Sequence, residues 1–174
     1  MIDPVVSVSL RCLLAAVFVA AAWHKVSDHA RFRAVLRAYR VIPGSLSDVV
    51  SWSVPLVEFL VAGGLASPSY RIAAGAAAGV LTLYSAAIAF NLARGRRDID
   101  CGCFGPAARV PLSGSLLARN AVLVSGALLA SAPLRDRPLV WVDGLTVVLL
   151  VLVTALLWVS FWRLRQVAGQ RRPS

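Results

Sequence analysis

Residues 71–92, RIAAGAAAGVLTLYSAAIAFNL, form an apolar run of the length that an α-helix needs to cross a lipid bilayer. Similar runs recur four times in the chain, at 5–24, 47–67, 112–132 and 139–161. The 174 residues are 59% hydrophobic and only 15% charged, with a mean hydropathy of +0.76, which lies outside the balance typical of soluble domains. The sequence therefore predicts an all-α integral membrane protein, a bundle of four to five transmembrane helices forming one domain over residues 1–174.

Three details qualify these spans. We expect the first run to be retained, because Arg11 lies inside it and not ahead of it as in a cleavable signal peptide. The run at 112–132 is the weakest, because it contains Arg119, Asn120 and four serines, so we expect it to pack against protein and not to face lipid on all sides. Residues 163–174 are predicted to form a basic tail.

Small residues predict close contact between two of the helices. Gly63 and Gly64 lie near the end of the run at 47–67, and residues 73–80 read AAGAAAGV. Small side chains let helix backbones approach each other in a membrane. We interpret this run as a helix-packing surface and not as a nucleotide-binding loop.

The segment between the first two runs predicts a short amphipathic helix in the lipid headgroup layer. Arginines alternate there with apolar residues at helical spacing, which are Phe32, Val35, Leu36 and Tyr39. Pro43 and Gly44 then end the helix.

The chain is strongly basic, with a net charge of +10 and a pI of about 11.2. In a soluble protein this charge would suggest nucleic-acid binding, but here the charges sit between apolar spans, so we attribute them to membrane topology and anionic headgroups. The loops after the first and third spans and the tail hold thirteen Lys and Arg residues, against three on the opposite side. The positive-inside rule then places the loop after the third span on or near the cytoplasmic face.

That loop contains two cysteines one residue apart, in DIDCGCFGP at residues 98–106. Gly102 between Cys101 and Cys103 permits the backbone angles that a disulfide across one residue would require. Such a ring is strained and therefore easily reduced, which suits a pair that exchanges electrons better than a permanent cross-link. The pattern alone is equally compatible with two ordinary reduced cysteines.

Cysteines can also bind a metal ion or act as small apolar packing residues. A closed zinc site normally has four ligands, and Cys101, Cys103, His24 and His29 would supply them only if two loops meet, so we expect no metal. Cys12 lies toward the opposite end of the first span, where we expect a small apolar packing residue.

Glu58 lies in the middle of the second span, where a carboxylate needs a partner or takes up a proton. We expect Arg119 to be that partner, with Arg11 as the second choice, and Asn120 and Asn91 to complete the hydrogen bonding. Two interpretations remain open. The pair fixes helix register, or Glu58 or Arg119 lines a cavity under the thiol pair and handles a proton or a quinone head group.

The motif DCGCFG, which includes Phe104, resembles the MauE family of methylamine utilisation membrane proteins, part of the broader DoxX-like group. The resemblance extends over about residues 11–120, and the fifth span matches only as a hydrophobic segment. Further residues fit the family pattern, namely Lys25, Tyr39, Pro43, Pro55, Glu58, Asn91, Arg94, Gly95, Arg119 and Asn120.

This resemblance implies a multi-pass protein of the bacterial cytoplasmic (inner) membrane that is needed to mature the small subunit of methylamine dehydrogenase. It also implies a thioredoxin-like partner with which the C-x-C pair exchanges disulfides. The layout is similar to vitamin K epoxide reductase and its bacterial relatives, which implies that this end of the bundle faces outward and that a quinone accepts the electrons. The orientation from charge and the orientation from this similarity are opposite, and the sequence leaves both open.

The leading hypothesis is a membrane thiol-disulfide oxidoreductase or redox relay with Cys101 and Cys103 as its reacting residues. The alternative is a non-catalytic membrane scaffold or chaperone that docks a partner through its basic first loop. Transport of a small solute past Glu58 and Arg119 has little support, because five short spans leave limited room for a pathway.

Overall fold

In the computed structural model, residues 1–41, 43–96, 112–138 and 140–170 are described, and these residues are almost entirely helical. Ile2 and Leu134 form an isolated parallel β-bridge. In chain order the elements are α1 (Pro4–Ser27), α2 (His29–Tyr39), the short 3₁₀ helix η1 (Gly44–Leu46), α3 (Ser47–Ala66), α4 (Tyr70–Ala93), α5 (Gly114–Ala130) and α6 (Trp141–Gln170).

Three segments are long and apolar enough to cross a membrane: α1, Gly44–Ala66 and α4. The apolar helix α5 and the apolar part of α6, Trp141–Leu157, are shorter. The chain is therefore a helical membrane protein, while the count of four to five spans stays a prediction.

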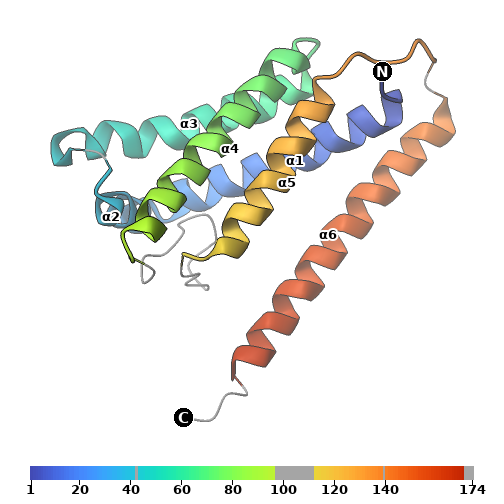
Figure 1. Ribbon diagram of the computed structural model, residues 1–174. Helices are drawn as coiled ribbons and strands as arrows, with labels where there is room; N and C mark the ends of the chain where they lie inside the picture. The colour runs from blue at the N-terminus through green and yellow to red at the C-terminus, as the bar shows by residue number, and fades with distance from the viewer. Residues whose placement is uncertain (42, 97–111, 139, 171–174) are drawn as a thin grey trace.

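Four helices, α1, α3, α4 and α5, pack together, and α6 diverges from them toward the C-terminus (Figure 1). Aliphatic, alanine and phenylalanine side chains from α1, α3, α4 and α5 form the main buried core. Most large apolar residues of α6 that the structure describes are exposed, such as Leu156 and Leu157. Lipid is the natural environment for such a surface.

A shared aspartate joins α1 to α2. The carboxylate of Asp28 accepts a hydrogen bond from the backbone N–H of Arg31 (3.2 Å), and the backbone N–H of Asp28 donates to the carbonyl of His24 (3.2 Å). Asp28 therefore ends one helix and begins the next. Helix α2 ends at Tyr39 and is followed by Arg40 as its C-cap, which has the left-handed φ of 50°. Asp48 at the start of α3 forms ion pairs with Arg33 and Arg37 of α2.

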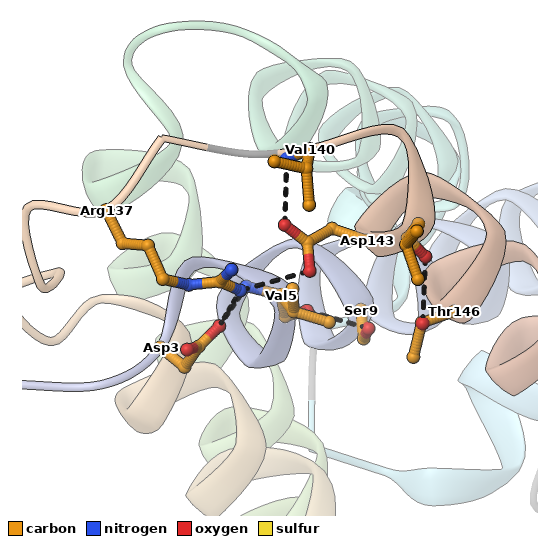
Figure 2. A network of polar contacts seen from close by, with 8 residues as sticks. Asp3, Val5, Ser9, Arg137, Val140, Asp143 and Thr146 are labelled. Carbon is orange, nitrogen blue, oxygen red and sulfur yellow. Dashed lines mark hydrogen bonds and ion pairs between the residues drawn. The ribbon is translucent and has the colours of Figure 1, made fainter.

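A network of polar contacts fixes the N-terminus and the start of α6 (Figure 2). Arg137 donates to Asp3 (3.2 Å) and to Asp143 (3.1 Å). The backbone continues the connection, because Ile2 donates to the carbonyl of Pro133 (2.9 Å). One arginine thus ties the beginning of α1 to the connection between α5 and α6.

Helices α3 and α4 approach closely at one glycine. A Cβ atom added to Gly64 would lie 2.8 Å from the Cβ of Ala73, whereas one added to Gly63 would meet nothing within 4 Å. The predicted packing of the small-residue run against α3 is confirmed at Gly64, while Gly63 faces outward. The side chain of Ala73 is a single methyl group fixed to the backbone of α4, so it cannot rotate away to relieve the contact.

We predict that Gly64→Ala destabilises the protein by about 1–3 kcal/mol, the range for overpacking a well-packed core. Gly63→Ala is the matched control and should be neutral or slightly stabilising, because alanine favours helix over glycine. Thermal unfolding of both variants in detergent, followed by circular dichroism, measures the difference. Equal unfolding temperatures would contradict the close approach of α3 and α4.

We also predict a pH dependence from the N-terminal network. The pKa of Asp3 is lowered from 3.8, first by the hydrogen bond from the Val5 N–H and then by Arg137. A carboxylate with a depressed folded pKa contributes stability above its unfolded pKa, and this contribution is lost as the pH falls through the folded value. Stability should therefore decline below pH 3.8, and Asp3→Asn should reduce this decline when melting is measured across that range. An identical decline in both proteins would contradict a role for Asp3.

Candidate functional site

A buried ion pair joins α1 to α3. The Nζ of Lys25 lies 2.6 Å from Oε1 of Glu58, and the two side chains are only 4% and 0% exposed. The Tyr84 hydroxyl donates to the same carboxylate oxygen at 2.8 Å, which adds α4 to the cluster. Charges buried this deeply persist only when they are paired and hydrogen-bonded. This oxygen therefore connects three helices.

The expected partner of Glu58 was wrong. We expected Arg119 or Arg11, but the ion pair is made by Lys25. Helix α1 continues to Ser27, so Lys25 lies inside the helix and not beyond its end. Its aliphatic chain can then reach inward along the bundle.

Arg11 instead lies beside the C-terminal end of α3. Its Nε donates to the carbonyl of Leu65 at 2.7 Å, and its guanidinium lies 4.1 Å from the centroid of the Tyr70 ring. A cation next to the terminal carbonyls of a helix is favoured by the helix dipole. Arg11 thus stabilises the end of α3 that is remote from Glu58.

Arg119 and Asn120 form a second polar group on α5. Arg119 donates to the Asn120 side-chain oxygen at 3.2 Å, and the Asn120 amide donates to the Ser85 hydroxyl of α4 at 3.2 Å. Asn120 is only 1% exposed. This contact between α5 and α4 supports the prediction that residues 112–132 pack against protein at these polar positions. Asn120 was expected to complete the hydrogen bonding of Glu58, but its side chain bonds Ser85 and Arg119 instead.

A cavity of about 150 Å³ brings the two polar groups together. Lys25, Glu58, Tyr84 and Arg119 line it, so Arg119 shares a cavity with Glu58 although the ion pair is made by Lys25. The remaining walls include Phe18 and other apolar residues of α1, α4 and α5. Glu58 and Arg119 therefore line one cavity, while the thiol pair beneath which it was expected lies outside the described residues.

Asn91 does not join Glu58 as expected but secures the end of α4. Its side-chain amide donates to the Ala87 carbonyl (3.0 Å), and its side-chain oxygen accepts from Arg96 (3.3 Å). It is fully buried. A buried amide next to a helix end satisfies backbone groups locally, which explains why it is not available to the ion pair.

The apolar residues of α2 face the part of the bundle that contains Lys25 and Tyr84. Together with these two residues they line a second, smaller cavity of about 100 Å³. Tyr39 also packs beside Ile88 and Leu116. The predicted helical spacing from Phe32 to Tyr39 is confirmed by α2.

Cys101, Gly102, Cys103 and Phe104 lie outside the described residues. Among the residues that are described, no group of three His, Cys, Asp or Glu side chains could hold a metal ion. His29 is hydrogen-bonded to Ser51 (3.1 Å) and stacked on Trp52 (4.1 Å between ring centroids).

The expectation for Cys12 was wrong, because its free thiol is exposed on α1 and not packed against protein. Cys12 lies on the side of α1 that faces away from the bundle. Both sides of this helix are apolar, so hydropathy alone does not distinguish the outer side from the side that faces the core.

We predict that removing one member of the ion pair, as in Lys25→Met, costs about 3–5 kcal/mol, because it strands a buried charge. Lys25→Met combined with Glu58→Gln should cost less than the sum of the single variants. Denaturant unfolding in micelles measures this coupling. Arg11→Met serves as the control, since its distance from Glu58 should make the two effects additive within about 0.5 kcal/mol; an additive Lys25–Glu58 pair would contradict the assignment.

The sequence model of the family described as Methylamine utilisation protein MauE matches residues 3–133, which end before α6. No solved structure matches the chain.

Curated relatives agree with that match. Methylamine utilization protein MauE of Paracoccus denitrificans is 45% identical over 129 residues, covering 74% of this chain and 69% of the relative. The protein of the same name from Paracoccus versutus is 40% identical over 131 residues, covering 75% and 70%. That from Methylorubrum extorquens is 38% identical over 126 residues, covering 72% and 68%. The buried Lys25–Glu58 pair and the cavity beside it thus lie within a chain that belongs to the MauE family of methylamine utilisation proteins.

Proposed function

We propose that this protein is a membrane thiol-disulfide oxidoreductase or redox relay that serves methylamine utilisation, with Cys101 and Cys103 as its reacting residues. The observation that carries the proposal is the DCGCFG motif at residues 100–105, inside the segment matched by the MauE family. A disulfide across one residue is strained and easily reduced, as a relay requires. Gly102 supplies the backbone freedom and Phe104 an apolar neighbour.

In the exchange, a thiolate of one protein attacks the disulfide of the other. A mixed disulfide forms and one thiolate leaves; a second thiolate then attacks the mixed disulfide and releases the two proteins. The disulfide thereby passes from one protein to the other, and two electrons pass in the opposite direction. One of Cys101 and Cys103 forms the mixed disulfide, and the other resolves it.

The polar cluster supports a role in handling the protons of this exchange. Residues 97–111 connect the end of α4 to the start of α5. Tyr84 lies nine residues before Ala93, and Arg119 lies five residues after Gly114, which at 1.5 Å per residue are about 14 and about 8 Å along their helices. Glu58 and Arg119 would therefore line a cavity beneath the thiol pair.

The other family-pattern residues support this arrangement. Lys25 holds Glu58, and Asn120 holds α5 against α4. Asn91 secures the end of α4 that leads into the motif, and Tyr39 packs α2 against the same region. We assign these four residues a positioning role and not a reacting one.

The proposed location is the bacterial inner membrane, with four to five spans. Helix α2, whose apolar residues face the bundle and whose arginines lie between them, would rest in the headgroup layer. The side that carries the thiol pair is left between the two orientations described above. A membrane-impermeant maleimide applied to intact cells, with and without prior reduction, separates them.

The proposed partner is a thioredoxin-like protein, and the proposed final beneficiary is the small subunit of methylamine dehydrogenase. Support comes from the names of the relatives, which refer to methylamine utilization. If maturation of that subunit includes the pairing of its cysteines, a membrane relay would supply the route.

We predict that Cys101→Ser combined with Cys103→Ser lowers the yield of active methylamine dehydrogenase at least about tenfold, because no mixed disulfide can form. The measurement is dehydrogenase activity in a host whose own copy of the gene has been removed, grown on another carbon source and induced with methylamine. Cys12→Ser is the matched control, since Cys12 lies on α1 and outside the motif in the sequence.

The same experiment tests the non-catalytic alternative. Immunoblots must show equal amounts of each variant in the membrane. Full dehydrogenase activity with both cysteines replaced would overturn the relay and favour a scaffold or chaperone that docks its partner through the basic residues of α2.

A further inference from the structure

The smaller cavity, of about 100 Å³, lies near the end of the bundle where α2 is found (Figure 1). Apart from Lys25 and two tyrosines, the residues that line it are apolar, and they come from α2, α3 and α4: Phe32, Val35, Leu36, Val54, Ala87 and Ile88. An apolar cavity stays free of water, and one of about 150 Å³ takes up benzene. This smaller space therefore suits a short stretch of a single hydrocarbon chain.

The cavity borders the outer surface of two membrane-spanning segments. Val54 of α3 and Ala87 of α4 line it and are only half-buried. Apolar residues close to them in the same helices are exposed, with Leu56 at 59% and Leu83 at 70%. Both helices belong to segments that are long and apolar enough to cross a membrane. A hydrocarbon chain of the bilayer therefore enters the cavity from the side, without passing through water.

A tryptophan places the cavity just below the headgroup layer. Trp52 of α3 is 58% exposed and stacks on His29 of α2. Exposed tryptophans collect at the interface between membrane and water. Val54 follows two residues later, about 3 Å further toward the middle of α3. A lipid with one chain in the cavity would thus carry its headgroup at the level of α2.

Arginines of α2 lie at that level. Arg33 and Arg37 are four residues apart on one face of α2, with side chains 38% and 54% exposed, and the exposed Arg40 follows the end of the helix. Asp48 pairs with both Arg33 and Arg37. One carboxylate therefore serves two guanidinium groups, and the positive charges of this face outnumber the negative one. Such a surface attracts lipids with a net negative charge.

We propose that this cavity holds one acyl chain of an anionic phospholipid, whose headgroup is bound by Arg33, Arg37 and Arg40. Helix α2 supplies both parts of the site, because its apolar residues line the cavity and its arginines alternate with them. The site differs from the general attraction of a basic helix for the bilayer surface, since it takes up one lipid at one position. The proposal uses the position of α2 in the headgroup layer and not the thiol chemistry.

Two lipids with the same chains test the site in the unaltered protein. Dioleoylphosphatidylglycerol is anionic, whereas dioleoylphosphatidylcholine has no net charge. Each is titrated into the full chain in detergent micelles, and bound lipids are counted by native mass spectrometry. One phosphatidylglycerol molecule should bind about tenfold more tightly than phosphatidylcholine, or better, because several arginines contribute. Equal affinities, or the absence of a single tightly held lipid, would overturn the proposal.

Two variants of α4 locate the acyl chain. Ala87→Phe fills part of the cavity and should weaken phosphatidylglycerol binding about tenfold or more. Ala86→Phe is the matched control, because Ala86 is the neighbouring residue, is exposed and does not line the cavity. If the two variants bind phosphatidylglycerol equally well, the chain lies elsewhere and the proposal fails.

Two further variants locate the headgroup. Arg40→Asn removes one positive charge, and asparagine tolerates the left-handed φ of this position. This variant should lose about threefold or more of the preference for phosphatidylglycerol. Arg71→Asn is the control, since Arg71 is exposed at the other end of α4, and it should leave the preference unchanged. An equal loss in both variants would show that overall charge, and not this site, selects the lipid.

The lipid site and the proposed relay fail separately. The protein with both Cys101→Ser and Cys103→Ser should bind phosphatidylglycerol as the unaltered chain does. Unaltered dehydrogenase maturation in a protein without a preferred lipid would refute the lipid site alone. Full maturation by the double cysteine variant with its lipid bound would refute the relay alone.

Discussion

The pairing of Lys25 with Glu58 is the interaction on which the rest of the bundle depends. An exposed ion pair contributes little to stability, but a buried pair sets a strict geometric condition, since either charge alone in this interior is costly. Both side chains are almost completely buried, and Tyr84 donates to the same oxygen. The register of α1, α3 and α4 is therefore fixed at one level of the bundle.

That register determines what lies beside the pair. With α1 and α3 held antiparallel, Arg11 meets the carbonyl of Leu65 near the far end of α3. The wall of the cavity is completed by α5, whose position depends on the bond from Asn120 to Ser85 of α4. A shift of one residue in α3 would remove the carboxylate from Lys25 and from the cavity together.

The sequence predicted local features well and long-range pairings poorly. The span expected at 47–67 is a helix over Ser47–Ala66, and the span expected at 71–92 is a helix over Tyr70–Ala93. Hydropathy is a property of neighbouring residues, so these bounds follow from the chain itself. The partner of Glu58 depends on how the helices are rotated about their axes. An apolar run that covers whole turns of about 3.6 residues does not specify this rotation.

The same limit explains two smaller differences. Gly63 and Gly64 are equally small, and the rotation of α3 alone decides that Gly64 meets Ala73. Helix α6 extends to Gln170, beyond the apolar run at 139–161, because backbone hydrogen bonding continues where hydropathy falls. The motif at 100–105 was recognised from its residue order, which requires no knowledge of packing.

The aspartate between α1 and α2 has a mechanical implication. Asp28 closes one helix and opens the next with no intervening linker, and Lys25 lies less than one turn upstream. Because no flexible linker separates α2 from α1, the position of the headgroup-facing helix is tied directly to the turn of α1 that holds the ammonium group.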